Sequence, residues 1–120
     1  MSRESRKVQD EFERWSRETR RGAATLAVLA VVDRSPSYGY ELVKHLEQTV
    51  TFLQLEEGTV YPILRRLEER LLLRSEWNYD DPTKPKKYYR ITEEGKRALA
   101  MMTETWFVLA SEMRKLLGGS

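Results

Sequence analysis

Apolar and polar positions in the first part of the chain follow two different helical patterns. Residues 4–21 are mostly charged, and their apolar stripe is narrow, with Val8, Phe12 and Trp15 at spacings of four and three. This pattern is typical of a helix exposed to solvent. Residues 23–33 are more continuously apolar and predict a buried helix. Gly22 stands between the two patterns and, because glycine weakens a helix, we expect residues 1–21 to form a helical extension before the folded domain.

The next segment predicts a turn and another buried helix. The sequence RSPS at 34–37 is typical of a turn, and Ser37 is a suitable helix N-cap. Residues 38–48 then carry apolar groups at helical spacing, namely Tyr38, Leu42, Val43 and Leu46. Residues 49–54, which are rich in β-branched side chains, predict an extended segment or a loop.

The sequence EEGTVYPILRRLEERLLL, residues 56–73, predicts a third buried helix with an unusual outer face. At about 100° per residue, its core stripe consists of Val60, Ile63, Leu64, Leu67 and Leu71. The opposite face carries Gly58, Pro62, Arg65, Arg66 and Glu69. Proline is tolerated near a helix start, and together with glycine it keeps that end thin. The backbone can therefore approach a surface closely, with the two arginines one turn behind.

A hairpin with a basic edge follows. Residues 72–79 and 86–91 have the composition of strands, and DDPTKP at 80–85 is a turn. Alternation places Tyr89 and Ile91 inward, and Lys86, Tyr88 and Arg90 on the other face. The basic residues Lys84, Lys86, Lys87 and Arg90 fall within seven positions that contain no acid.

The C-terminal segment, residues 92–120, predicts a long dimerisation helix that begins at Thr92. Its apolar residues are spaced by three and four, and we call them the seam: Leu99, Met102, Trp106, Leu109, Met113 and Leu116. Val108 and Leu117 widen it. Such a heptad pattern is typical of helices that pair with one another.

Composition excludes several classes of protein. The 120 residues carry a net charge of only +2 and no cysteine, which suits a reducing cytoplasm. The eleven residues from Gly22 that follow Arg20 and Arg21 resemble a signal sequence, but they are too few to span a bilayer, so we expect a buried helix, no membrane association and a cytoplasmic protein. The sequence shows no arrangement of nucleophile and base, no phosphate loop and no metal-ligand cluster around its one histidine, His45. We therefore expect neither an enzyme nor a cofactor.

The order of elements is three helices, a two-stranded hairpin and a long helix. This order predicts a mostly α protein with a small β-hairpin, a winged helix-turn-helix domain over residues 22–91, in which the third helix enters the DNA major groove. Arginine is well suited to guanine edges and phosphates. Arg65 and Arg66 are therefore candidates for DNA contact, although an ordinary solvated helix face and a solubilising strand edge remain alternatives.

Three sequence blocks resemble the PadR family of transcriptional regulators: SYGYEL (37–42), GTVYPILRRLEE (58–69) and KKYYRITEEGKRAL (86–99). The resemblance implies a dimeric winged-helix repressor of double-stranded operator DNA, of the short subclass with one C-terminal helix. It also implies a set of DNA-contacting residues: Ser37, Tyr38, Tyr40, Thr59, Tyr61, Arg65, Arg66, Lys84, Lys86 and Lys87. The family usually has glycine where this chain has Leu71, which predicts a different helix end.

The resemblance further implies a site for a small planar aromatic effector. Trp106 matches the aromatic residue of the C-terminal helix that lines a ligand pocket at the dimer interface in drug-sensing members. Trp15 and Phe12 are candidates for the same pocket, or for anchoring the first helix on the seam, and Trp106 itself is equally suited to packing. The sequence thus favours a repressor relieved by an aromatic ligand. The alternative is a winged-helix ligand-binding or protein-adaptor module that does not bind DNA.

Overall fold

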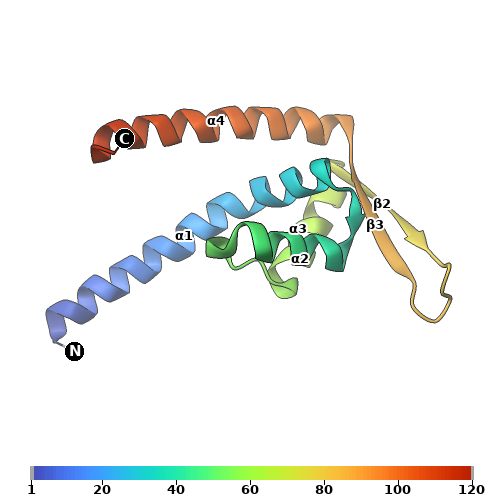
Figure 1. Ribbon diagram of the computed structural model, residues 1–120, viewed down its shortest axis with the longest axis horizontal. Helices are drawn as coiled ribbons and strands as arrows, with labels where there is room; N and C mark the ends of the chain where they lie inside the picture. The colour runs from blue at the N-terminus through green and yellow to red at the C-terminus, as the bar shows by residue number, and fades with distance from the viewer. Residues whose placement is uncertain (1, 120) are drawn as a thin grey trace.

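The computed structural model describes residues 2–119 and has the expected winged helix-turn-helix fold (Figure 1). Its elements are α1 (Arg3–Arg34), β1 (Ser37–Tyr38), α2 (Gly39–Thr49), the short 3₁₀ helix η1 (Thr51–Leu53), α3 (Glu57–Glu69), β2 (Leu73–Asn78), β3 (Lys86–Ile91) and α4 (Glu93–Leu117). The sheet is antiparallel, in the order β1-β3-β2. The hairpin of β2 and β3, the wing, projects from the helical body, and α4 runs back above α1.

Helix α1 is continuous over 32 residues, so the predicted interruption at Gly22 is wrong. A glycine inside a helix costs only about 1 kcal/mol relative to alanine. The residues that follow it, including Val28, Leu29 and Val32, are buried in the core, and each such side chain contributes about 1.5–3 kcal/mol. Burial therefore outweighs the local weakness. The segment that resembled a signal sequence is the buried half of α1.

The core lies where α1, α2, α3 and the sheet meet. Its fully buried large side chains are Val28, Leu29, Val32, Leu42, Leu55, Val60, Leu64, Leu67 and Leu73. The predicted stripe of α3 is confirmed at Val60, Ile63, Leu64 and Leu67. Leu71 does not belong to it, because α3 ends at Glu69 and the Leu71 side chain is 71% exposed. Tyr89 is buried, as alternation predicted.

Two local predictions around α2 are wrong. Ser37 does not cap the helix, because it belongs to β1 and pairs with Tyr89 of β3. Its hydroxyl donates a hydrogen bond to the Ser35 carbonyl (3.0 Å), and Tyr38 is the N-cap instead. The segment after α2 contains one 3₁₀ turn rather than an extended strand. Pairing with the wing sets the chain path here, and a local turn signal does not reveal it.

The end of α3 is joined tightly to the start of α4. Leu71 adopts a left-handed conformation with φ 62°. The N–H of Leu72 donates to the Leu67 carbonyl (2.9 Å), and that of Leu71 to Glu68 (3.0 Å). This is a Schellman C-cap, so the helix ends as it would with glycine, and the expectation of a different end is wrong. Thr92 Oγ1 donates to the Leu71 carbonyl (2.7 Å), which ties α4 to the same joint.

Gly95 allows α4 to start directly against the base of the wing. A Cβ at this position would lie 2.1 Å from the Leu72 carbonyl oxygen and 2.7 Å from a carbon of Ile91. Thr92 caps α4 by accepting a hydrogen bond from the Gly95 N–H (3.0 Å). The direction in which α4 leaves the domain is therefore fixed by backbone contacts.

Candidate nucleic-acid interface

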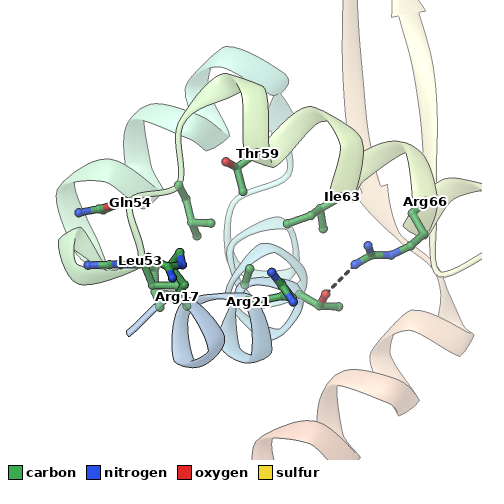
Figure 2. Close-up of a pocket in the computed structure, with 11 residues that line it drawn as sticks. Arg17, Arg21, Leu53, Gln54, Thr59, Ile63 and Arg66 are labelled. Atoms are coloured by element: carbon green, nitrogen blue, oxygen red, sulfur yellow. Dashed lines mark hydrogen bonds between the residues drawn. The ribbon is translucent and has the colours of Figure 1, made fainter. Parts of the chain in front are cut away.

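The two adjacent arginines of α3 point to different neighbours. With Val60 at 0° and about 100° per residue, Arg65 lies near 140° and Arg66 near 240°. Arg66 reaches α1, where its Nη2 donates to Thr25 Oγ1 (2.8 Å; Figure 2). Arg65 is exposed on the outer face. The pair that looked equivalent in the sequence therefore divides into one free guanidinium and one that is held against another helix.

The outer face of α3 is thin at its leading end. Gly58, Pro62 and Arg65 are all exposed there. A Cβ added at Gly58 would have no heavy atom of the described residues within 4 Å. Packing inside the protein therefore does not require glycine at this position. A backbone without side chains at its start can approach the floor of a groove closely.

Tyrosines from α2 and the wing surround Lys86. Its Nζ lies 5.5 Å from the ring centroids of both Tyr38 and Tyr40. The Tyr38 ring packs edge-on against Tyr88, with centroids 5.4 Å apart, and Tyr38 Oη accepts a hydrogen bond from Asn78 (2.6 Å). The rings orient the ammonium group through cation–π attraction, while Lys86 itself stays exposed.

Three predicted segments meet at a groove of about 400 Å³ between α2, α3 and the wing. Tyr38, Tyr40, Tyr61 and Lys86 are among the residues that line it. Tyr61 packs over Gly39, where a Cβ would lie 2.5 Å from Tyr61 Cε1. Burial, and secondarily the charge of Glu57, raise the pKa of Tyr61. Residues separated by more than forty positions are thus brought to one surface.

Lys87 differs from the other wing lysines. Its Nζ forms an ion pair with Glu68 of α3 (3.1 Å), and both side chains are about one-third exposed. Ser75 Oγ donates a second hydrogen bond to the same carboxylate. Burial alone would raise the pKa of Glu68, but these two hydrogen bonds and the charge of Lys87 together lower it. This arrangement fastens the wing to α3.

The other predicted DNA-contacting residues lie at the edges of this surface. Lys84 is exposed in the turn at the tip of the wing, where its N–H donates to the Asp81 carbonyl (2.9 Å). Ser37 is half-buried in β1. Thr59 is exposed on the side of α3 that faces α1, and it lines a second cleft there (Figure 2).

The predicted aromatic residues occupy two separate helices. Phe12 and Trp15 lie on α1 with ring centroids 6.1 Å apart, and both are more than half exposed. Trp106 lies on α4, is 43% exposed, and is not among the residues that line the shallow surface around Phe12 and Trp15. Within one chain, these three side chains therefore do not form one pocket.

An apolar cleft of about 490 Å³ between α1, α2 and α4 was not predicted. Leu99, Thr103 and Phe107 of α4 contribute to its lining, as does His45 of α2. The spacing of four between the α4 residues is a helical signal that the sequence contains. It was overlooked because the seam residues give a more regular heptad pattern.

The sequence pattern also gave no role to three arginines of α1. Arg17, Arg20 and Arg21 line a cleft of about 430 Å³ together with Arg66 of α3 (Figure 2). The signal was present as three basic residues within five positions, but the charged half of α1 suggested an ordinary solvated helix.

The fold and its basic surface define a winged helix-turn-helix DNA-binding protein. Residues 28–101 match the Transcriptional regulator PadR-like family, and the chain belongs to that family. Its single long C-terminal helix fits the short subclass. The protein is thus a DNA-binding transcriptional regulator, not an enzyme, and the prediction from the three sequence blocks is confirmed. No helix within residues 2–119 is long and apolar enough to cross a membrane.

Solved structures of similar proteins agree with this assignment. A PadR family transcriptional regulator from Eggerthella lenta is 41% identical, with a TM-score of 0.74 over 91% of this chain and 90% of that one. A transcriptional regulator from Clostridium thermocellum is 29% identical, with a TM-score of 0.72 over 82% and 96% of the two chains. A PadR-like regulator from Bacillus cereus is 28% identical, with a TM-score of 0.71 over 83% and 96%.

Proposed function

We propose that the protein is a homodimer that represses transcription by occupying operator DNA, and that a planar aromatic ligand at the α4 interface relieves repression. The observation that carries the proposal is the exposed apolar surface of α4. Within Glu93–Leu117, all of which the structure describes, Gly95 alone is buried. Leu109 is 50% exposed, Met113 40% and Leu116 81%. Fully burying one such side chain contributes about 1.5–3 kcal/mol.

Pairing two α4 helices covers the seam and also creates a suitable DNA-binding unit. A two-fold dimer presents two copies of α3 and two wings, which matches a palindromic operator with half-sites one or more helical turns apart. Doubling the number of phosphate contacts raises affinity steeply at low salt. Repression then follows from occupancy, because a dimer seated on promoter DNA excludes RNA polymerase from the same site.

The dimer is tested by sedimentation at tens of micromolar, and DNA binding by electrophoretic shift with the DNA upstream of the protein's own coding sequence. Leu109→Glu/Met113→Glu should give monomers and lose operator affinity. Met101→Glu/Ser111→Glu adds the same charge on other sides of α4 and should leave both properties intact. A wild-type monomer, or a Leu109/Met113 variant that remains dimeric, contradicts the proposed seam.

The ligand part of the proposal depends on Trp106. A seam position near the middle of α4 lies close to its symmetry mate, so two indoles can flank a slot for one flat molecule. Flat aromatic cations and phenols suit such a slot because stacking rewards planarity. Such a ligand should weaken DNA affinity, since ligand and DNA favour different dimer spacings and their coupling is reciprocal.

A panel of planar dyes, titrated by calorimetry without DNA, tests this site. We expect micromolar binding that is lost in Trp106→Ala. Trp77→Ala removes an exposed indole on the wing and serves as the matched control, with binding retained. Phe12→Ala and Trp15→Ala report whether α1 contributes to the pocket. Binding that persists undiminished in Trp106→Ala assigns Trp106 to packing alone.

A further inference from the structure

The cleft between α1 and α3 has an unusual concentration of positive charge. Arg17, Arg20 and Arg21 of α1 and Arg66 of α3 all line it, and we call these four residues the arginine cleft. Figure 2 shows Arg17 and Arg21 on α1, with Arg66 entering from α3. Across residues 2–119, none of the four guanidinium groups forms an ion pair with a carboxylate, and no acidic residue is among those that line the cleft.

Two of the four arginines have a structural role, and two do not. Arg20 Nε donates to the Phe52 carbonyl (2.8 Å), and its guanidinium lies 4.8 Å from the Phe52 ring centroid. Arg66 donates to Thr25. Arg17 and Arg21 are exposed, and their side chains have no hydrogen-bond partner among the described residues. The first pair therefore shapes the cleft, and the second pair leaves its donors available.

Like charges held in one cleft repel each other, and a bound anion relieves that repulsion. Guanidinium groups present planar forks of N–H donors that match phosphate oxygens, often in bidentate fashion. Thr59, at the leading end of α3, adds a hydroxyl to the same cleft. The donor set thus fits a phosphate group better than a carboxylate alone or an apolar ligand.

The position of the cleft indicates which phosphate it receives. Around the α3 axis, Tyr61 and Glu68 face the wing near 80–100° from Val60, whereas Thr59 and Arg66 face α1 near 240–260°. The exposed outer face, with Gly58 and its neighbours, lies between them. When the outer face enters a major groove, the wing lies along one DNA backbone and the arginine cleft along the other.

We propose that the arginine cleft binds backbone phosphates of the operator on the side of α3 opposite the wing. α1 is then part of the DNA-binding surface rather than only a support for the core. The inference rests on the proposed dimer seated on operator DNA, and it adds a sequence-independent contact to that complex. Phosphate contacts of this kind fix the orientation of the recognition helix without reading bases.

The test compares salt dependence of operator binding in the full-length dimer. Arg17→Gln/Arg21→Gln removes the two free guanidinium groups and leaves the structural pair intact. Each lost phosphate contact lowers the slope of log K against log salt by about 0.9, so two side chains in each of two protomers lower it by about 3.6. Affinity should fall roughly tenfold or more at moderate salt.

Arg3→Gln/Arg6→Gln is the matched control, because it removes two charges from the same helix. At about 1.5 Å per residue, Arg6 lies about 17 Å from Arg17 along α1, beyond a Debye length of about 8–10 Å. This control should leave the slope nearly unchanged, and thermal melts should show both double variants folded. An equal loss of slope in both variants points to net charge and overturns the inference.

A second measurement separates DNA phosphate from a free phosphate compound. Inorganic pyrophosphate is titrated into the wild type and into Arg17→Gln/Arg21→Gln, with binding followed by calorimetry. If this variant loses pyrophosphate binding but keeps the wild-type salt slope on DNA, the cleft serves a small anion and the proposal is overturned. If Lys86→Ala lowers the slope and the cleft variant does not, the inference fails while operator binding stands. Failure of the wild type to shift operator DNA overturns the proposed function instead.

Discussion

Replacing Gly58 with alanine should make the protein more stable and its DNA complex weaker. Gly58 is the second residue of α3. The added Cβ would meet no heavy atom of the described residues within 4 Å, and Gly58 is not among the residues with positive φ. Alanine is favoured over glycine by about 0.5–1 kcal/mol inside a helix. Near the helix start we expect about 0.5 kcal/mol, or about a 2 °C rise in Tm.

The DNA complex should respond in the opposite direction. If the leading end of α3 lies against the floor of the groove, a methyl group has to displace DNA or tilt the helix. Overpacking of a close contact costs about 1–3 kcal/mol, which corresponds to about 5- to 150-fold weaker binding. No loss of fold is involved, so the change in DNA affinity comes from the interface itself.

Fluorescence anisotropy with operator DNA and thermal melts of the free protein measure the two effects separately. Gly22→Ala is the matched control, because its Cβ also meets no heavy atom of the described residues within 4 Å; it should raise stability and leave affinity unchanged. Unchanged affinity in Gly58→Ala would refute the close approach of α3. A fall in stability would assign Gly58 a different role, accommodating Pro62, whose ring crowds the carbonyl four residues earlier.

Periodicity predicted the faces of the elements well, because burial is a property of one element against the whole core. The spacing of Val60, Leu64 and Leu67 marked the buried side of α3, and strand alternation marked Tyr89. These residues need no particular partner, only an apolar environment. The fold class could therefore be predicted from the order of such elements.

Local breaking and capping signals were less reliable, since tertiary contacts override them. Gly22 did not interrupt α1, because the buried half of that helix holds it in place. Ser37 and Tyr38 joined the sheet through β3, a partner about fifty residues away. Leu71 accepted a left-handed conformation because the C-cap and the Thr92 hydrogen bond require it.

The candidate interface was predicted as a list of basic and aromatic residues, without their pairing. Arg66 is bound to Thr25, 41 residues away, and Lys87 to Glu68, 19 residues away. No local pattern distinguishes them from Arg65 and Lys86, which remain exposed. The same limitation hid the arginine cleft, since its two halves come from helices far apart in the sequence.

The remaining predictions separate base reading, attachment of the wing and backbone strain. Arg65→Ala should cost about 1–3 kcal/mol and relax specificity if it reads a base edge, whereas Lys86→Ala should weaken all sequences alike and lower the salt slope by about one; competition assays with operator variants distinguish these outcomes. Glu68→Gln should lower stability at pH 7 by about 1 kcal/mol. Because the folded pKa of Glu68 lies below its ordinary value, this difference should vanish in unfolding titrations as the pH falls through the folded pKa, and a difference that persists in acid would contradict the ion-pair explanation. Leu71→Gly should stabilise the protein. Leu71 is held at φ 62°, which costs a residue with a Cβ about 1–2 kcal/mol, and its exposed side chain loses little burial on truncation. The greater freedom of glycine in the unfolded chain offsets about 0.4–1 kcal/mol, so we expect a net gain of about 0.5–1 kcal/mol in urea unfolding. Leu71→Ala keeps the Cβ and the strain and should show no such gain, so equal stability of the two variants would mean that the left-handed conformation is not strained.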